Sequence, residues 1–132
     1  DEVSYTTEQI VRITGEQPKF FRPPYISYNQ KMYDLIDLYF ICGYGCEDWE
    51  PSVTEQERIK RILHDAKPGF IILLHDMEDN VQTVEAIKTI IPALKEQGYE
   101  FVTVRDLFQK SGISPQKNVI YMGADEVRKN YE

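Results

Sequence analysis

Cysteine and histidine are scarce in this chain of 132 residues, which contains two of each. Cys42 and Cys46 are separated by three residues, a spacing that fits neither a C-x-x-C redox pair nor half of a zinc site with a second pair elsewhere. Because free cysteine is among the most buried residue types, the pattern favours two core residues over a disulfide or a metal role. It leaves the redox compartment open.

Long apolar stretches and clusters of basic residues are also missing. No run approaches the roughly 20 apolar residues that span a bilayer, and no secretory signal is recognisable at the start. The chain begins at Asp1 rather than Met, so we expect a processed product or a fragment. The net charge of -7 argues against a nucleic-acid backbone or an anionic membrane as partner. Binding to either needs clustered Lys and Arg, and the sequence has no basic run.

The chain does have enough apolar residues, 42% of the total, for one globular domain. Its strongest signal is the run GFIILL at 69–74, which is typical of a strand buried on both faces in a parallel sheet. Apolar residues at helical spacing then predict a helix over 80–97, with Gly98 just past its end. A second strand at 99–104 completes a unit of the size of a βαβ motif.

The same alternation occurs upstream, and a short helix at 105–110 follows it. The pattern predicts strands at 19–22 and 38–42 and helices at 7–14, 29–37 and 54–65. We therefore expect an α/β fold with about four parallel strands alternating with helices in a domain of residues 1–110. Residues 111–132 carry Gly112, Pro115 and a polar tail, and predict an irregular C-terminal extension.

Chemistry in parallel α/β sheets lies at the carboxyl ends of the strands. The first predicted strand ends in Arg22, two prolines and Tyr25. Proline has no N–H and holds the preceding residue extended, so Tyr25 is the first residue after the strand with a free amide. Such a turn can aim a guanidinium and a backbone N–H at one cleft, as an oxyanion site needs. The alternative is that the prolines only end a strand.

His75 follows the strand at 69–74 and is either a structural cap or a catalytic residue. A carboxylate beside an imidazole favours its protonated form, so Asp48 would keep His75 available as a general acid. Trp49 lies in a long loop and is a candidate pocket wall, while His64 is expected to complement a helix dipole. We expect Arg22, Asp48, Trp49 and His75 to surround a common pocket.

Four segments, FFRPPY, EDW, IILLHD and QTVEAIKTIIPALKEQGYEFVTVRDL, lie in the order and spacing of one known family. Over roughly residues 7–107 the chain resembles the polysaccharide deacetylases with the NodB homology domain, carbohydrate esterase family 4. The resemblance implies a distorted (β/α) barrel, of which this chain would be the C-terminal half. It also implies that a divalent metal, usually zinc, activates water to remove N-acetyl or O-acetyl groups from GlcNAc-type polysaccharides.

The resemblance further implies a role for each residue at the strand ends. Arg22 would orient the catalytic base, and the backbone N–H of Tyr25 would belong to the oxyanion hole. Asp48 would tune His75, which would be the general acid. The acetyl pocket would be lined by Trp49 and Leu73.

Two motifs of that family are absent from the chain: a T-F-D-D-G strand end, which gives the base and a metal ligand, and an H-x-x-x-H, which gives two further ligands. Gly45 also stands where the family often has an acidic residue. We therefore expect no metal site in this chain, a parent enzyme that holds the metal and the base in a missing N-terminal half, and inactivity of the isolated 132 residues.

A half-barrel has uncovered sheet edges and apolar surface, which invite pairing. The expected partners are thus an acetylated polysaccharide and either the missing half or a second copy, as a homo-oligomer or swapped dimer. The alternative function is a catalytically inactive half-barrel that serves in sugar binding or assembly. The resemblance implies a secreted or cell-surface location.

Overall fold

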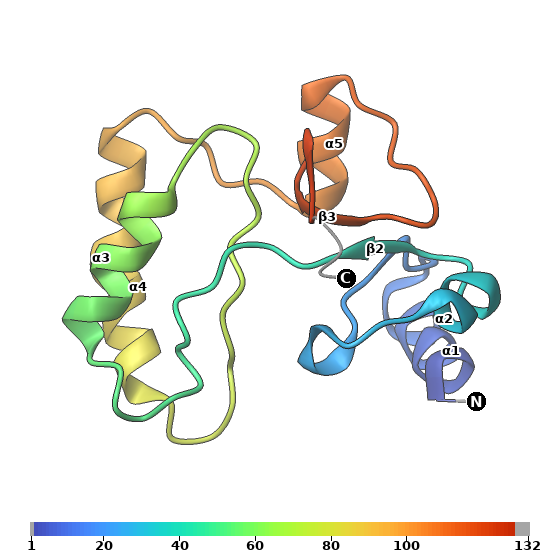
Figure 1. Ribbon diagram of the computed structural model, residues 1–132, viewed down its shortest axis with the longest axis horizontal. Coiled ribbons are helices and arrows are strands. Elements are labelled where there is room, and N and C mark those ends of the chain that lie inside the picture. The colour runs from blue at the N-terminus through green and yellow to red at the C-terminus, as the bar shows by residue number, and fades with distance from the viewer. Residues whose placement is uncertain (1, 129–132) are drawn as a thin grey trace.

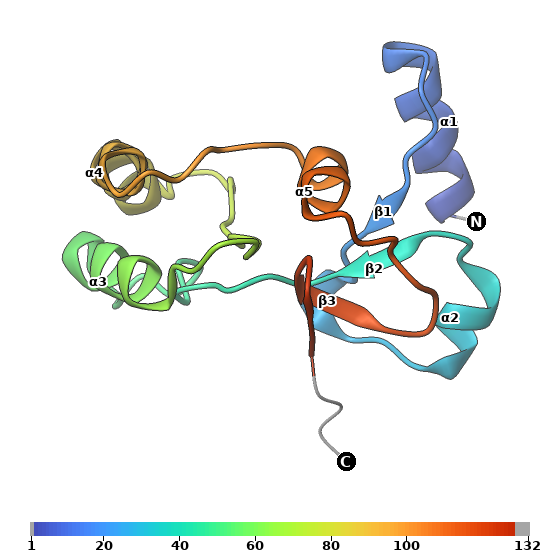
Figure 2. The same cartoon turned by 90° about the horizontal axis from the view of Figure 1, so that it is seen from above.

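The computed structural model describes residues 2–128, which form two groups of elements. Two helices lie side by side in one group, and a small sheet with the other helices forms the second; extended segments connect them (Figures 1 and 2). The elements are α1 (Glu2–Thr14), β1 (Phe20–Phe21), the 3₁₀ turn Pro24–Ile26, α2 (Gln30–Leu35), β2 (Tyr39–Ile41), α3 (Glu55–Asp65), α4 (Val81–Glu96), α5 (Val104–Ser111), β3 (Ile120–Gly123) and β4 (Glu126–Val127).

The sheet has four strands in the order β1-β2-β3-β4, and it is not closed into a barrel. β1 pairs with β2 and β2 with β3 in parallel, while β4 is antiparallel to β3. An α/β fold with a mostly parallel, unclosed sheet is therefore confirmed.

Two of the predicted strands are not regular strands. Residues 69–74 are extended and hydrogen-bonded, but to two different neighbours: Ile71 donates its amide to Met122 O at 3.1 Å, and Leu73 donates to Tyr44 O at 2.8 Å. The segment crosses between the two groups, so it forms isolated bridges instead of a continuous ladder. Residues 99–103 pair with no strand of the described sheet, and Thr103 already caps α5 by accepting the amide of Asp106 at 3.2 Å.

The prediction of an irregular segment over 111–132 was wrong for its second half. This half contains β3 (Ile120–Gly123), which lies in the middle of the sheet between β2 and β4. Gly112 and Pro115 had indicated an irregular chain, whereas Ile120 is 1% exposed and belongs to the core of the sheet. The end of that segment, 129–132, lies outside the described residues, and the division into domains stays a prediction.

The two groups have separate apolar cores that meet at the extended segment 69–74. Ile71 packs in the core of the sheet group with Phe108 and Tyr121. Its neighbour Ile72 packs against the core between α3 and α4, as expected of an extended backbone whose successive side chains point to opposite sides. Cys42 and Cys46 are free and buried in these cores, as predicted. No helix within residues 2–128 has the length and apolar character needed to cross a membrane.

Candidate active site

The loop after β2 and the extended segment 69–74 run side by side for a specific local reason. Tyr44 donates its amide to Ile71 O at 2.7 Å, and its carbonyl accepts the amide of Leu73 at 2.8 Å. Gly43 permits this approach, because its φ is +98° and a Cβ there would lie 2.7 Å from Ile71 O. The residues that follow on the two segments are thereby brought together.

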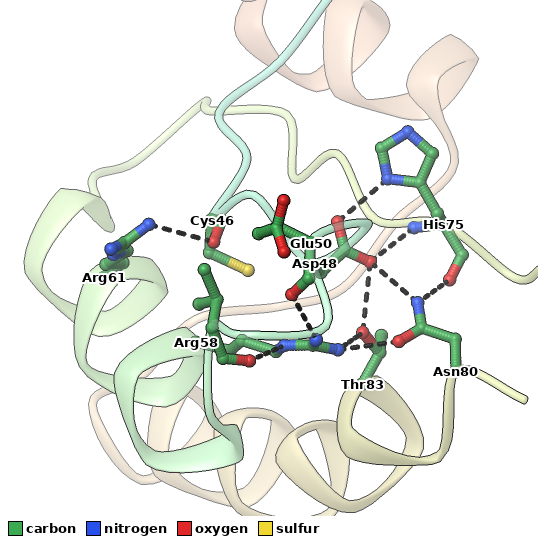
Figure 3. A network of polar contacts seen from close by, with 9 residues as sticks. Cys46, Asp48, Glu50, Arg58, Arg61, His75, Asn80 and Thr83 are labelled. Atoms are coloured by element: carbon green, nitrogen blue, oxygen red, sulfur yellow. Dashed lines mark hydrogen bonds and ion pairs between the residues drawn. The ribbon is translucent and has the colours of Figure 1, made fainter.

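Asp48 and His75 form the centre of the site (Figure 3). The carboxylate Oδ1 lies 2.9 Å from His75 Nδ1, and Oδ2 accepts the His75 backbone N–H at 2.7 Å. The Asp48 side chain is fully buried, whereas the His75 side chain is 41% exposed. Because an ionised carboxylate only accepts hydrogen bonds, Nδ1 carries the shared proton, and Nε2 is left to exchange a proton with a ligand.

The beginning of α4 supplies two more donors to the same carboxylate. Thr83 Oγ1 donates to Asp48 Oδ2 at 3.1 Å, and Asn80 Nδ2 approaches Oδ2 at 3.4 Å and donates to His75 O at 2.9 Å. Burial alone would raise the pKa of Asp48, but the hydrogen bonds from His75 and Thr83 outweigh burial and hold that pKa below its ordinary value. Asp48 is therefore ionised at neutral pH.

Arg58 of α3 completes the network from beneath. It is 2% exposed, and its Nη1 donates to Thr83 Oγ1 at 2.7 Å and to Asn80 Oδ1 at 2.6 Å. Sequence reasoning missed Arg58, Asn80 and Thr83. A signal for Arg58 was present, since it lies four residues before the buried Ile62 and thus on the apolar face of its helix.

The two predicted pocket residues lie next to this network. Trp49 is 52% exposed, so its indole presents surface to solvent beside the buried Asp48. Leu73 packs over Gly45: a Cβ at Gly45 would lie 3.1 Å from Leu73 Cδ2. The absence of an acidic side chain at position 45 is consistent with this tight contact.

Arg22 and Tyr25 belong to a different turn from the acid pair, the one that follows β1. Arg22 Nε donates to Cys42 O at 3.1 Å, and burial lowers the pKa of the guanidinium. Arg22 lines a cavity of about 440 Å³ with Ile72 and Leu74, whereas His75 lines a separate pocket of about 280 Å³. Tyr25 is fully exposed, with φ at 56°. The Arg22 guanidinium thus turns toward the carbonyl at the end of the neighbouring strand, and a common pocket of Arg22, Asp48, Trp49 and His75 stays a prediction.

Known proteins resemble the chain in sequence and structure, although no family model matches it. A bifunctional xylanase/deacetylase of Pseudobutyrivibrio xylanivorans is 49% identical over 92% of this chain and 20% of its own length. The Xyl-CE4 domain of a multidomain xylanase from the hindgut metagenome of Trinervitermes trinervoides superposes with a TM-score of 0.91 at 46% identity, over 94% of this chain and 61% of that one. The chain belongs to the polysaccharide deacetylases of carbohydrate esterase family 4.

Other members of this deacetylase family also match most of this chain. A family 4 acetyl xylan esterase from Clostridium thermocellum, solved with a cobalt ion, has a TM-score of 0.87 at 36% identity over 93% of this chain and 62% of that chain. A peptidoglycan-N-acetylglucosamine deacetylase of Bacillus cereus is 33% identical over 84% of this chain and 42% of its own length. The present chain thus spans only part of these relatives, from a fifth to about three fifths of their length.

A divalent metal does not fit the residues present. Within residues 2–128 no three His, Cys, Asp or Glu side chains are grouped so that they could hold a metal ion. His64, the second histidine, lies in the last turn of α3 with its ring 84% exposed beside Asp65.

Proposed function

We propose that this chain supplies the proton-donating side of a polysaccharide deacetylase site. The observation that carries the proposal is the direct contact of the buried Asp48 carboxylate with the Nδ1 of a half-exposed His75. A carboxylate in that place fixes the imidazole ring and stabilises its protonated form. His75 is then a general acid whose Nε2 proton is available at the surface.

His75 acts on the leaving group as the acetyl group is removed. When the bond between the acetyl carbon and the sugar nitrogen or oxygen breaks, the electron pair goes to that nitrogen or oxygen, and the Nε2 proton of His75 is transferred to it. The imidazole becomes neutral, with its Nδ1 proton retained on the hydrogen bond to Asp48. Because the pKa of Asp48 lies below its ordinary value, this carboxylate does not take the Nδ1 proton from the imidazole.

The other strand-end residues surround the acetyl group in this proposal. The Tyr25 amide donates a hydrogen bond to the oxyanion, and Arg22 orients the catalytic base. The Ile26 and Ser27 amides are already bonded to the carbonyls of the two prolines, so the turn keeps a fixed shape. The walls of the acetyl pocket are Trp49 and Leu73.

The base and the ligands of a divalent metal come from residues beyond these 132 in our proposal. Two facts support it: the relatives extend well beyond the matched part, and the described residues offer no metal-ligand group. A cobalt ion is present in one family 4 structure, which supports a divalent metal in the parent enzyme. Such a metal would supply Lewis-acid activation of water.

Acetylated polysaccharide is the proposed substrate class. The relatives at 49% and 46% identity are described as xylanase proteins with a deacetylase or CE4 part, and the Bacillus cereus relative at 33% as a peptidoglycan deacetylase. We therefore place O-acetylated xylan beside N-acetylated glycans as a candidate. These polymers lie outside cells, so the proposed location is secreted or cell-surface.

A two-part activity assay tests the proposal. The 132-residue chain and a version extended by the coding sequence upstream of Asp1 are incubated with a divalent metal and with acetylated xylan or N-acetylated chitooligosaccharide. Acetate release by the extended version, with none by the chain alone, is expected. Deacetylation by the chain alone at a comparable rate would show that the base and metal site lie within it, and inactivity of both versions would favour a binding module.

An assembly or sugar-binding module is the second candidate, and the cavity of about 440 Å³ favours it. Apolar side chains of α4, α5 and the segment 69–74 line that cavity, among them Ile90, Leu94 and Leu107. Apolar surface of this kind is typical of an interface. Sedimentation at increasing concentration would detect a homo-oligomer or swapped dimer, and a monomer at high concentration argues against self-assembly.

A further inference from the structure

Arg58 is a buried cation to which the proposed chemistry gives no role. Among residues 2–128 the buried polar side chains are Arg58, Asp48 and Thr83, which are 2%, 1% and 4% exposed. Burying a guanidinium costs free energy unless its donors are bonded and its charge is compensated. These three side chains belong to one connected network, which suggests that they are buried for a common purpose.

The guanidinium is held in one orientation by its own helix end and the loop before it. Nε donates to Val53 O at 2.8 Å, and Nη2 donates to Glu50 O at 3.2 Å. The remaining nitrogen, Nη1, faces Thr83 Oγ1 and Asn80 Oδ1, as Figure 3 shows. Arg58 therefore points its donors at the two side chains that lie between it and Asp48.

The chemistry of the groups determines the direction of each hydrogen bond. Arginine has donors only, so Thr83 Oγ1 must accept from Arg58 and has its single proton left for Asp48. The Asn80 oxygen likewise faces Arg58, which turns its NH₂ toward His75 O and Asp48 Oδ2. Without a donor at position 58, the hydroxyl could rotate and the amide could flip.

We propose that Arg58 is a positioning residue that fixes the donor direction of Thr83 and Asn80, and thereby holds Asp48 in the orientation that aligns the His75 ring. The charge of Arg58 also compensates the buried carboxylate across one hydroxyl group. The expected effect of Arg58 on turnover rests on the proposed function of His75. Its effect on the orientation of Asp48 does not depend on that function. The two can be tested separately.

Hydrogen exchange of the His75 backbone amide measures the orientation of Asp48 directly. That amide lies outside any regular strand, and its acceptor is Asp48 Oδ2 at 2.7 Å. Thr83→Val removes the bridging hydroxyl with little change of shape. We expect the His75 amide to exchange about tenfold faster, which corresponds to about 1.4 kcal/mol. Thr83→Ser restores the hydroxyl and should restore slow exchange.

Two arginines of α3 provide a matched pair. Arg58→Met should accelerate the His75 amide as Thr83→Val does. Arg61→Met removes the same charge three residues further on, where the guanidinium bonds to Glu47, Glu57 and Cys46 O instead, and should leave the amide unchanged. If Arg58→Met fails to fold, the Thr83→Val and Thr83→Ser pair decides the question.

A purely structural role predicts a different result. It would accelerate the amide of Leu94, buried on α4, as much as that of His75, and this outcome would overturn the proposal. Wild-type exchange at His75 in folded Thr83→Val would overturn it as well. In an active extended version, Arg58→Met should lower kcat with KM unchanged. Altered exchange with normal kcat would contradict the general-acid role of His75 while the positioning by Arg58 stands.

Discussion

The segment at 48–75 and the turn at 22–26 contrast sharply, although both carry predicted site residues. Asp48 is 1% exposed and receives donors from His75, Thr83 and Asn80. Tyr25 at the other turn is fully exposed and has a left-handed backbone. The acid pair is thus preorganised by this chain's own residues, whereas the Tyr25 side chain at the turn lies in solvent.

The difference shows which part of a deacetylase site this chain can build alone. A buried carboxylate needs all its hydrogen bonds in place, so α3 and α4 must be assembled before His75 is aligned. A backbone amide on an exposed turn needs only the geometry of two prolines. Substitutions in the two regions should therefore differ in their consequences, and the greatest loss is expected at His75.

Replacing His75 tests the acid side of the contrast. In an active extended version, His75→Ala should reduce turnover of an N-acetylated substrate roughly 10²- to 10⁴-fold, because an amine cannot leave without a proton. The loss on an O-acetylated substrate should be smaller, since an alkoxide is a better leaving group. His64→Ala is the control and should keep activity. Equal losses on both substrates would argue against proton donation to the leaving group.

Removing the charge of Asp48 should destabilise the folded chain. Asp48→Asn keeps the shape but turns an NH₂ toward donors, and it leaves Arg58 buried without a carboxylate to compensate it. We expect a loss of about 3 kcal/mol in the free energy of unfolding, measured in urea. Tyr25→Ala, on the exposed turn, should change it by less than about 0.5 kcal/mol. Similar losses in the free energy of unfolding for Asp48→Asn and Tyr25→Ala would mean that the two regions do not differ in this respect.

Acid should weaken the acid-pair region through the same carboxylate. The pKa of Asp48 is lower in the folded state than its ordinary value, so its contribution to stability is present above the unfolded pKa and is lost as pH falls through the folded one. The free energy of unfolding of the wild type should therefore drop below about pH 4, near the ordinary aspartate pKa. The drop should be smaller in Asp48→Asn. An equal drop in both would assign the pH dependence to other carboxylates.

Much of this organisation could be predicted from the sequence, because local signals agree with the tertiary structure there. The alternation of strands and helices located α3, and the Asp48–His75 contact followed from residues placed after two apolar runs. The prediction of a strand at 99–104 was wrong, because residues 99–103 pair with no strand of the described sheet and α5 begins at Val104. β3 was missed because glycine and proline nearby outweighed a short apolar run.

Two residues of the site could not be predicted from the sequence for a different reason. Arg58 and Thr83 look like ordinary helix residues, and only the packing of α3 against α4 makes them neighbours of Asp48. Arg22 was expected beside His75 because both follow apolar strands. Its guanidinium bonds to Cys42 O, a contact that the strand-end pattern does not reveal, and its place around one pocket with His75 stays a prediction.

The smallest effect is expected at the exposed turn itself. Tyr25 has φ 56° and ψ 15°, a left-handed conformation that costs a residue with a Cβ roughly 1 kcal/mol. Asparagine tolerates this conformation better than tyrosine, and a β-branched residue tolerates it worse. Because the side chain is fully exposed, Tyr25→Asn and Tyr25→Val should differ only in this strain.

Urea unfolding of the two variants measures that strain. Tyr25→Asn should be slightly more stable than the wild type and Tyr25→Val less stable, with a total spread of about 1 kcal/mol. Such a spread means that the prolines hold the turn in one shape before any substrate binds, so its amide is aimed in advance. Identical midpoints would mean that the turn relaxes freely, and the Tyr25 amide would then acquire its direction only from a partner or a ligand.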